Sequence, residues 1–152
     1  MKLVSFEIDF PNSVNEPFGI TSIHTPSYNC IAWAFGDDTK WYWPDPISTY
    51  YWPINVPREI TIEAFIKLYE TTSYEVCTND SLEVGYEKVA IFTDKHNIPT
   101  HAARQLENGY WTSKLGQHID VQHSIKSIED GSYGKATVFM KRIKIPVGNT
   151  GS

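Results

Sequence analysis

The sequence contains few cysteines, no long apolar run and no cluster of basic residues. Cys30 and Cys77 are the two cysteines among 152 residues, so at most one disulfide could form, and an intracellular protein usually keeps such thiols reduced. No stretch approaches the roughly 18 apolar residues that a membrane-spanning helix requires. Glu7 and Asp9 interrupt the N-terminal segment, which argues against a signal peptide. We therefore expect a cytoplasmic protein with no membrane contact, with signal-independent delivery left open.

The charge balance disfavours another class of partner. The formal net charge is −5, whereas a protein that binds phosphate backbones gains affinity from a basic surface that releases counterions. We therefore expect no nucleic-acid partner.

The composition is that of one folded domain. Hydrophobic residues make up 41% and charged residues 20% of the chain, a balance that rules out a disordered chain and a coiled coil. The length fits one domain of ordinary size. We predict a single domain over residues 1–146, followed by a polar, glycine-containing and flexible tail over residues 147–152.

Two segments have the pattern of short helices. Residues 28–36 contain neither proline nor glycine before Gly36, and this helix would carry Cys30 in its first turn. Residues 61–72 repeat apolar side chains at intervals of three and four, with Thr61 as a candidate N-cap.

The remaining patterns predict β-structure. Alternating or continuous apolar residues indicate strands over residues 1–10, 87–93, 119–123 and 135–145, and a hairpin over 100–106 and 110–115. Asn108-Gly109 would form the hairpin turn, because both residues tolerate positive φ. Helices followed by a sheet predict an α+β fold.

Cys30 is the first residue with possible chemistry. A cysteine at the start of a helix faces unpaired N–H groups and the positive end of the helix dipole, which together stabilise a thiolate. The alternative is that Cys30 is a small core residue, as free cysteines often are.

His101 is the second residue with possible chemistry. A strand would hold its imidazole rigidly, as a general base requires. If Glu107 faces Tyr110 across the turn, alternation puts His101 on one face with these residues: Ala103, Gln105, Thr112, Lys114 and Gly116. The alternative is an ordinary structural histidine.

The two residues lie within motifs that carry a resemblance. NCIAWA at 29–34, THAARQ at 100–105 and SKLG at 113–116 match an uncharacterised bacterial family. More distantly, the order of a cysteine on a helix and then a histidine on a strand resembles the NlpC-type and CHAP-type, papain-like cysteine hydrolases. This resemblance implies a papain-like fold in which a helix bearing Cys30 packs on a small antiparallel sheet.

The resemblance also implies catalytic roles. Cys30 would be the nucleophile and His101 the base. The resembling enzymes place a polar residue that orients the histidine on the following strand, but the expected His101-facing positions there are Thr112 and Lys114. Asp120 on the next segment is the first substitute as a third catalytic residue, since a carboxylate would fix the imidazole tautomer; Gln105 and His123 are further substitutes.

Substrate contacts are predicted around this centre. Eight aromatic residues fall within residues 33–52, and flat aromatic faces with polar edges suit stacking on sugars, peptides or apolar chains. The predicted contacts are Trp41, Trp43 and Trp52 from this segment, Asn29 as a possible oxyanion donor, and Gln105 and Lys114 from the His101 face. The alternatives are that the tryptophans only pack a loop over the core and that Asn29 only caps a helix.

Two functions follow. The first is a cysteine hydrolase or acyl transferase that acts on a peptide, peptidoglycan-like or small-molecule amide and needs no cofactor. The second is a non-catalytic binding module whose aromatic segment, residues 33–52, contacts a partner protein or glycan. Metal binding is not expected, because His118, Asp120 and His123 lack the spacing of a zinc site.

Overall fold

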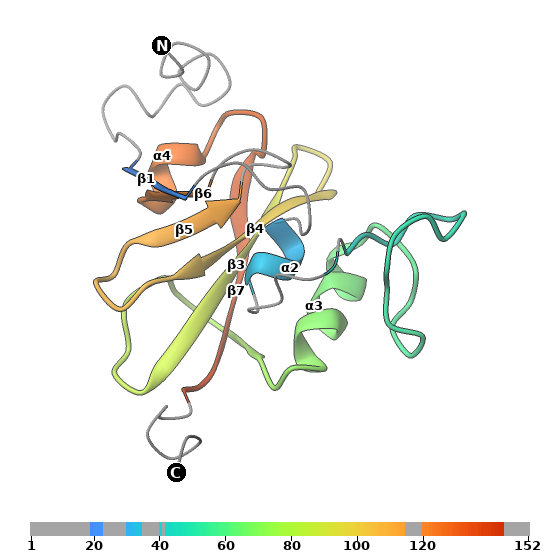
Figure 1. Cartoon of the computed structure of the whole chain (residues 1–152), viewed down its shortest axis with the longest axis horizontal. Helices are drawn as coiled ribbons and strands as arrows, with labels where there is room; N and C mark the ends of the chain where they lie inside the picture. Colours follow the sequence, from blue (N-terminus) through green and yellow to red (C-terminus); the bar gives the residue numbers. More distant parts are fainter. Residues whose placement is uncertain (1–18, 23–29, 35–39, 41, 115–119, 145–152) are drawn as a thin grey trace.

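The computed structural model describes residues 19–22, 30–34, 40, 42–114 and 120–144. It contains the following elements: β1 (Gly19–Ser22), α2 (Cys30–Ala34), α3 (Ile62–Glu70), β2 (Glu75–Cys77), β3 (Tyr86–Thr93), β4 (Pro99–Gln105), β5 (Trp111–Lys114), β6 (Asp120–His123), α4 (Ile125–Ile128) and β7 (Lys135–Ile143). Figure 1 shows their arrangement.

One sheet dominates the described structure. Its seven strands follow the order β1-β6-β5-β4-β3-β7-β2, and each described pair of neighbouring strands is antiparallel. The helices have only five, nine and four residues. The predicted α+β, papain-like fold is therefore wrong: the strands form a mainly β architecture, and the segment that begins at Cys30 is a little over one helical turn.

The two faces of the sheet carry separate hydrophobic clusters. Neighbouring residues of a strand point to opposite faces, and in β3 Ile91 belongs to one cluster while Phe92 belongs to the other. In β4 the same division separates Ala102 from Ala103. Because β3 is central and buried on both faces, it is a nearly continuous apolar run.

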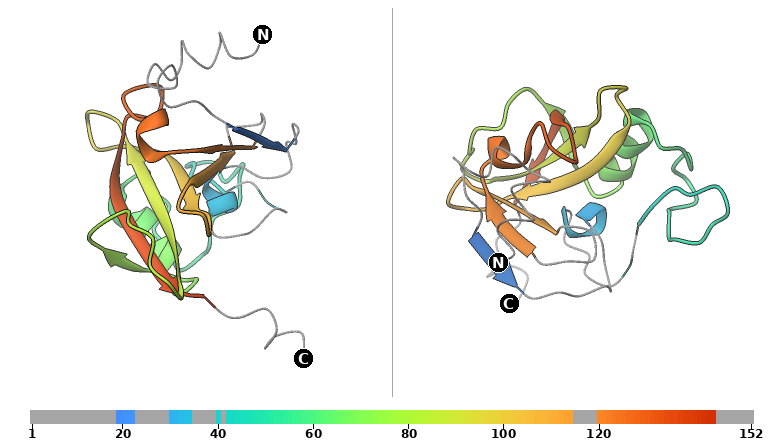
Figure 2. Two further views of the ribbon diagram at one scale, coloured as in Figure 1. Left: turned by 90° about the vertical axis from the view of Figure 1, so that its left-hand side faces the viewer. Right: turned by 90° about the horizontal axis from the view of Figure 1, so that it is seen from above.

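Helices cover both faces. On the Ala102 face, α3 contributes Phe65, Leu68 and Tyr69 to the first cluster. Thr61 caps α3, since its side chain accepts a hydrogen bond from the Ala64 N–H, which confirms the predicted cap. Ile125 and Ile128 of α4 pack in the second cluster, and the right view of Figure 2 shows α4 (orange) well separated from α3 (green).

The β4–β5 hairpin has a different register from the predicted one. Arg104 pairs with Thr112, and the Leu106 N–H donates to the Tyr110 carbonyl. The turn therefore has three residues and ends at Gly109, whose φ is +90°. A shift of one residue exchanges the two faces of β5, so Ser113, rather than Thr112 or Lys114, shares a face with His101.

Other boundaries were only partly predictable. The last two strands, β6 and β7, confirm the predicted 119–123 and 135–145 strands in position. The sequence did not reveal the edge strands β1 and β2 or the short α4. The predicted strand over 1–10 and the predicted tail over 147–152 lie outside the described residues.

Candidate functional site

Cys30 begins the five-residue α2, which packs against β4 and β5 (Figure 1). Its side chain is 7% exposed and lies in the first cluster with Ile31 and Ala102. Tyr69 anchors the helix, because its hydroxyl donates to the Ile31 carbonyl at 2.9 Å. Burial, and secondarily the nearby Cys30 thiol, raise the pKa of Tyr69 well above its usual value. The thiol thus lies in a packed apolar environment.

His101 is completely buried on β4. Its ring stacks on Tyr133 with centroids 3.9 Å apart and meets the edge of Phe92 at 5.5 Å. Both aromatic residues belong to the second cluster. His101 therefore faces away from the cluster that contains Cys30.

A hydroxyl group links His101 to a second buried histidine. The Nε2 atom of His101 lies 2.8 Å from Ser113 Oγ, which lies 2.6 Å from His123 Nε2. The Nδ1 atom of His123 lies 2.7 Å from the Ser124 carbonyl oxygen. We refer to His101, Ser113 and His123 as the histidine relay; its members come from β4, β5 and β6.

The relay fixes the tautomers of both rings. A carbonyl oxygen only accepts, so Nδ1 of His123 carries the proton and its Nε2, in the neutral ring, accepts from Ser113. The Ser113 hydroxyl has one proton, so His101 Nε2 must donate to Ser113 Oγ. The Nδ1 atom of neutral His101 is then a bare lone pair, and it has no hydrogen-bond partner in the structure.

Both imidazoles are held neutral. Burial, and secondarily the neighbouring His123, hold the pKa of His101 well below its usual value. Burial also lowers the pKa of His123 to about 4, although the bond to the Ser124 carbonyl acts in the opposite direction. The relay therefore contains two neutral rings at pH 7.

The structure does not bring the predicted catalytic residues together. Cys30 and His101 lie in clusters on opposite faces of β4, and neither nitrogen of His101 bonds to the thiol. Asp120 begins β6, opposite Lys114 in the register, but the side chains of Asp120 and Lys114 lie outside the description. Ser113 bonds to His101 instead, and His123, one of the predicted substitutes, contacts His101 only through Ser113. Reading residues 107–109 as a three-residue turn would have predicted Ser113.

The predicted substrate-contact residues that the structure describes make contacts within the protein. Trp43 meets Phe65 of α3 edge to face at 5.6 Å. Trp52 is buried, and its indole N–H donates to the Pro57 carbonyl at 2.9 Å. Gln105 donates to the Asp80 carbonyl at 2.9 Å. Two further predicted contacts, Asn29 and Trp41, lie outside the described residues.

Residues 42–58 form a loop that projects from the sheet, and we call it the aromatic loop (Figure 2, right). Arg58 fixes it from inside, because its guanidinium donates to the carbonyls of Asp45 and Tyr50 at 2.8 and 3.4 Å. The Asp45 carboxylate accepts the N–H groups of Thr49 and Tyr50 at 2.8 and 3.1 Å. These bonds give the loop a defined shape without a helix or strand.

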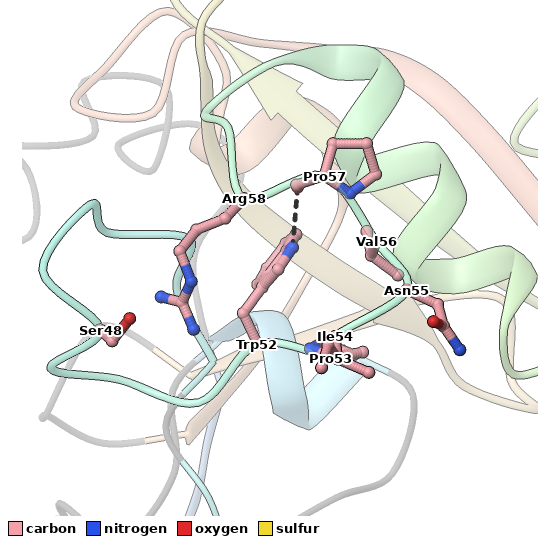
Figure 3. Close-up of a pocket in the computed structure, with 8 residues that line it drawn as sticks. All are labelled: Ser48, Trp52, Pro53, Ile54, Asn55, Val56, Pro57 and Arg58. Carbon is pink, nitrogen blue, oxygen red and sulfur yellow. Dashed lines mark hydrogen bonds between the residues drawn. The ribbon is translucent and has the colours of Figure 1, made fainter.

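The aromatic loop exposes several large apolar side chains. Its exposed large side chains are Ile47, Tyr50, Tyr51 and Ile54, of which Ile54 is 96% exposed. An open pocket of about 600 Å³ lies on the loop, and Ile54 is one of its lining residues. Figure 3 shows its lining: Ser48, Trp52, Pro53, Ile54, Asn55, Val56, Pro57 and Arg58.

Fold and site together define a single-sheet antiparallel domain with a buried histidine relay and an apolar projecting loop. A family model described as "Domain of unknown function (DUF7689)" matches residues 19–141, and the chain belongs to this family. No curated protein and no solved structure matches the chain. None of the described helices is long and apolar enough to cross a membrane. Within the described ranges, no three His, Cys, Asp or Glu side chains are grouped to hold a metal ion.

Proposed function

We propose that this protein is a non-catalytic binding module whose aromatic loop contacts a partner protein. The observation that carries the proposal is the contrast within the loop: internal hydrogen bonds fix its backbone, while Ile47 and Ile54 are 82% and 96% exposed. Large apolar side chains exposed on an ordered surface are typical of interaction sites. A preordered loop also loses little conformational entropy when it binds.

The chemistry of the loop favours a protein over a glycan. Ile47 and Ile54 offer no hydrogen bonds, and a sugar needs several. The one charged group that lines the pocket, Arg58, already donates to Asp45 and Tyr50. A partner segment with apolar, uncharged side chains would therefore match this surface best.

A peptide-display selection tests the proposal. Peptides selected on the wild-type chain are measured against a double variant, Ile47→Ser with Ile54→Ser. Val84→Ser is the matched control, because Val84 is 99% exposed outside the loop. We expect the double variant to weaken binding at least about tenfold and the control to bind like the wild type. Selected peptides that bind the double variant equally well would contradict the proposal.

A cysteine hydrolase or acyl transferase is a second candidate, and one observation favours it. A buried polar atom without a partner calls for an explanation, and His101 Nδ1 is such an atom, left unprotonated by the relay. A general base requires such a lone pair. In this mechanism Cys30 would attack an amide carbonyl, although the two residues face opposite clusters.

Thiol labelling tests this second candidate. Iodoacetamide rates are compared for Cys30 and Cys77 across pH, using single Cys→Ser variants to assign each rate. An activated Cys30 would react faster than the partly exposed Cys77 and with a depressed pKa. A Cys30 that reacts more slowly than Cys77 at every pH would exclude a catalytic thiol.

A further inference from the structure

A second open pocket lies at the tip of the β4–β5 hairpin, at the end of the molecule opposite the aromatic loop (Figure 1). Its volume is about 440 Å³. Three separate segments contribute its lining: Asp80, Asn108, Gly109, Tyr110, Trp111, Ser124 and Ile125. A ligand here would be independent of the partner proposed for the aromatic loop.

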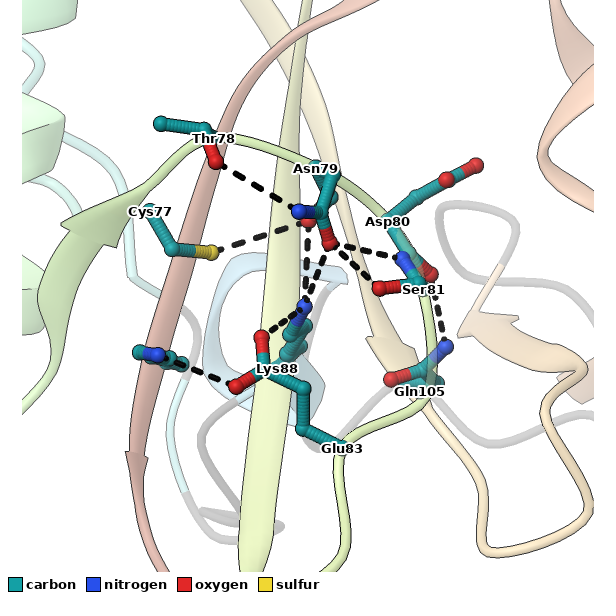
Figure 4. A network of polar contacts seen from close by, with 9 residues as sticks. Cys77, Thr78, Asn79, Asp80, Ser81, Glu83, Lys88 and Gln105 are labelled. Atoms are coloured by element: carbon teal, nitrogen blue, oxygen red, sulfur yellow. Dashed lines mark hydrogen bonds and ion pairs between the residues drawn. The ribbon is translucent and has the colours of Figure 1, made fainter.

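Buried polar contacts hold the segment that carries Asp80. The fully buried Lys88 donates to the carbonyl and side-chain oxygens of Asn79 at 3.2 and 3.0 Å and pairs with Glu83 at 2.7 Å. Gln105 donates to the Asp80 carbonyl at 2.9 Å. Figure 4 shows that these bonds leave the Asp80 carboxylate pointing away from the Lys88 ammonium.

Hydrogen bonds also fix the other two walls. Asn108 Oδ1 accepts the Tyr110 N–H at 3.0 Å, which shapes the turn. A Cβ atom on Gly109 would have no heavy atom within 4 Å, so the space above the turn is open. On the far side, the bond from His123 Nδ1 holds the Ser124 carbonyl. The pocket is therefore ordered before any ligand arrives.

The free groups of the pocket match a hydroxyl-rich ligand. Neither the Asp80 carboxylate nor the Tyr110 hydroxyl bonds to any described residue. The half-exposed Tyr110 ring adds a flat apolar face, and Asn108 also lines the pocket. Carboxylate and amide groups bond to arrays of hydroxyls, and an aromatic face packs on the C–H side of a sugar ring.

The charged groups that line the pocket favour a neutral ligand over an ionic one. No Lys or Arg lines the pocket, which disfavours phosphate and other anions. A single exposed carboxylate is well screened by water and salt, so it holds a small cation only weakly. We propose that this pocket binds a neutral sugar, which stacks on Tyr110 and donates hydroxyl hydrogen bonds to Asp80.

Ligand-observed NMR and calorimetry on the full chain test the proposal. The probes are the methyl glycosides of glucose, galactose, mannose and N-acetylglucosamine, with tetramethylammonium and inorganic phosphate as charged comparisons. The variants are Tyr110→Ala and Asp80→Asn. Tyr50→Ala is the matched control, because Tyr50 is a tyrosine of similar exposure (42%, against 51% for Tyr110) on the aromatic loop.

We expect at least one glycoside to bind and Tyr110→Ala to weaken its binding about tenfold. Asp80→Asn should weaken it as well, and Tyr50→Ala should leave it unchanged. Circular dichroism of each variant checks that the fold is intact. The proposal is overturned if no glycoside binds, if only the charged probes bind, or if glycoside binding survives Tyr110→Ala.

Discussion

Acid should destabilise this protein through the histidine relay, and His123→Gln should remove much of that effect. His123 has a pKa of about 4 in the folded protein because it is buried, whereas an unfolded histidine titrates near 6.5. The unfolded state therefore binds more protons below pH 6.5. The stabilisation by neutral His123 is complete above that pH and is lost as the pH falls from 6.5 towards 4.

The structure sets the size of this effect. A difference of about 2.5 pKa units corresponds to about 3 kcal/mol of unfolding free energy lost between pH 6.5 and 4. The buried His101, whose pKa is also lowered, adds to the loss in the same direction. Single domains have only about 5–15 kcal/mol of stability, so the wild type should approach unfolding near pH 4.

Urea unfolding followed by tryptophan fluorescence at pH 4, 5, 6 and 7 measures this dependence. His123→Gln loses the titrating ring but keeps an amide that can bond to Ser113. We expect it to be less stable than the wild type at pH 7, and the difference to shrink by about 3 kcal/mol at pH 4. His96→Gln is the control, because His96 is exposed. Parallel pH profiles for the wild type and His123→Gln would refute the buried, neutral relay.

Two further predictions concern the free energy of unfolding. Gly134→Ala should lower it by more than about 3 kcal/mol, because the new Cβ would overlap the Thr93 carbonyl. Gly109→Ala should lower it by only about 1–2 kcal/mol, because Gly109 has a similar positive φ but open space around it. Glu83→Gln should lower the free energy of unfolding by about 2 kcal/mol more than Lys88→Met does. The Glu83 variant leaves the buried Lys88 ammonium without its carboxylate, whereas the Lys88 variant removes the buried charge. Urea midpoints at pH 7 measure both differences, and equal costs within either pair would contradict the packing or the ion-pair argument.

The sequence predicts where helices and turns lie better than it predicts which face of the sheet each side chain occupies. Residues 61–72 have both a helical period and a capping threonine, so α3 and its N-cap could be predicted. Asn108-Gly109 predicts a turn, but two-residue and three-residue turns share this dipeptide. The choice between the two turn lengths depends on how β5 pairs with β4. The three-residue turn places Ser113 on the same face of the sheet as His101.

The separation of Cys30 from His101 was not predictable for a related reason. Cys30 and His101 follow the order of a thiol hydrolase, but order along a chain does not determine which face of a sheet a helix covers. Here Tyr69 of α3 holds the Cys30 helix on the Ala102 face, while His101 packs on Tyr133 beneath the other face. These contacts join segments far apart in sequence, and no local pattern encodes them.

The affinity of one selected peptide for three forms of the chain tests the proposed binding function most directly. Calorimetry would compare the wild type, Ile54→Ser and Cys30→Ser. If the aromatic loop is the binding surface, Ile54→Ser weakens binding about tenfold or more, and Cys30→Ser binds with the wild-type affinity. The opposite pattern, in which Cys30→Ser abolishes binding and Ile54→Ser has no effect, would contradict the account and support the thiol site instead.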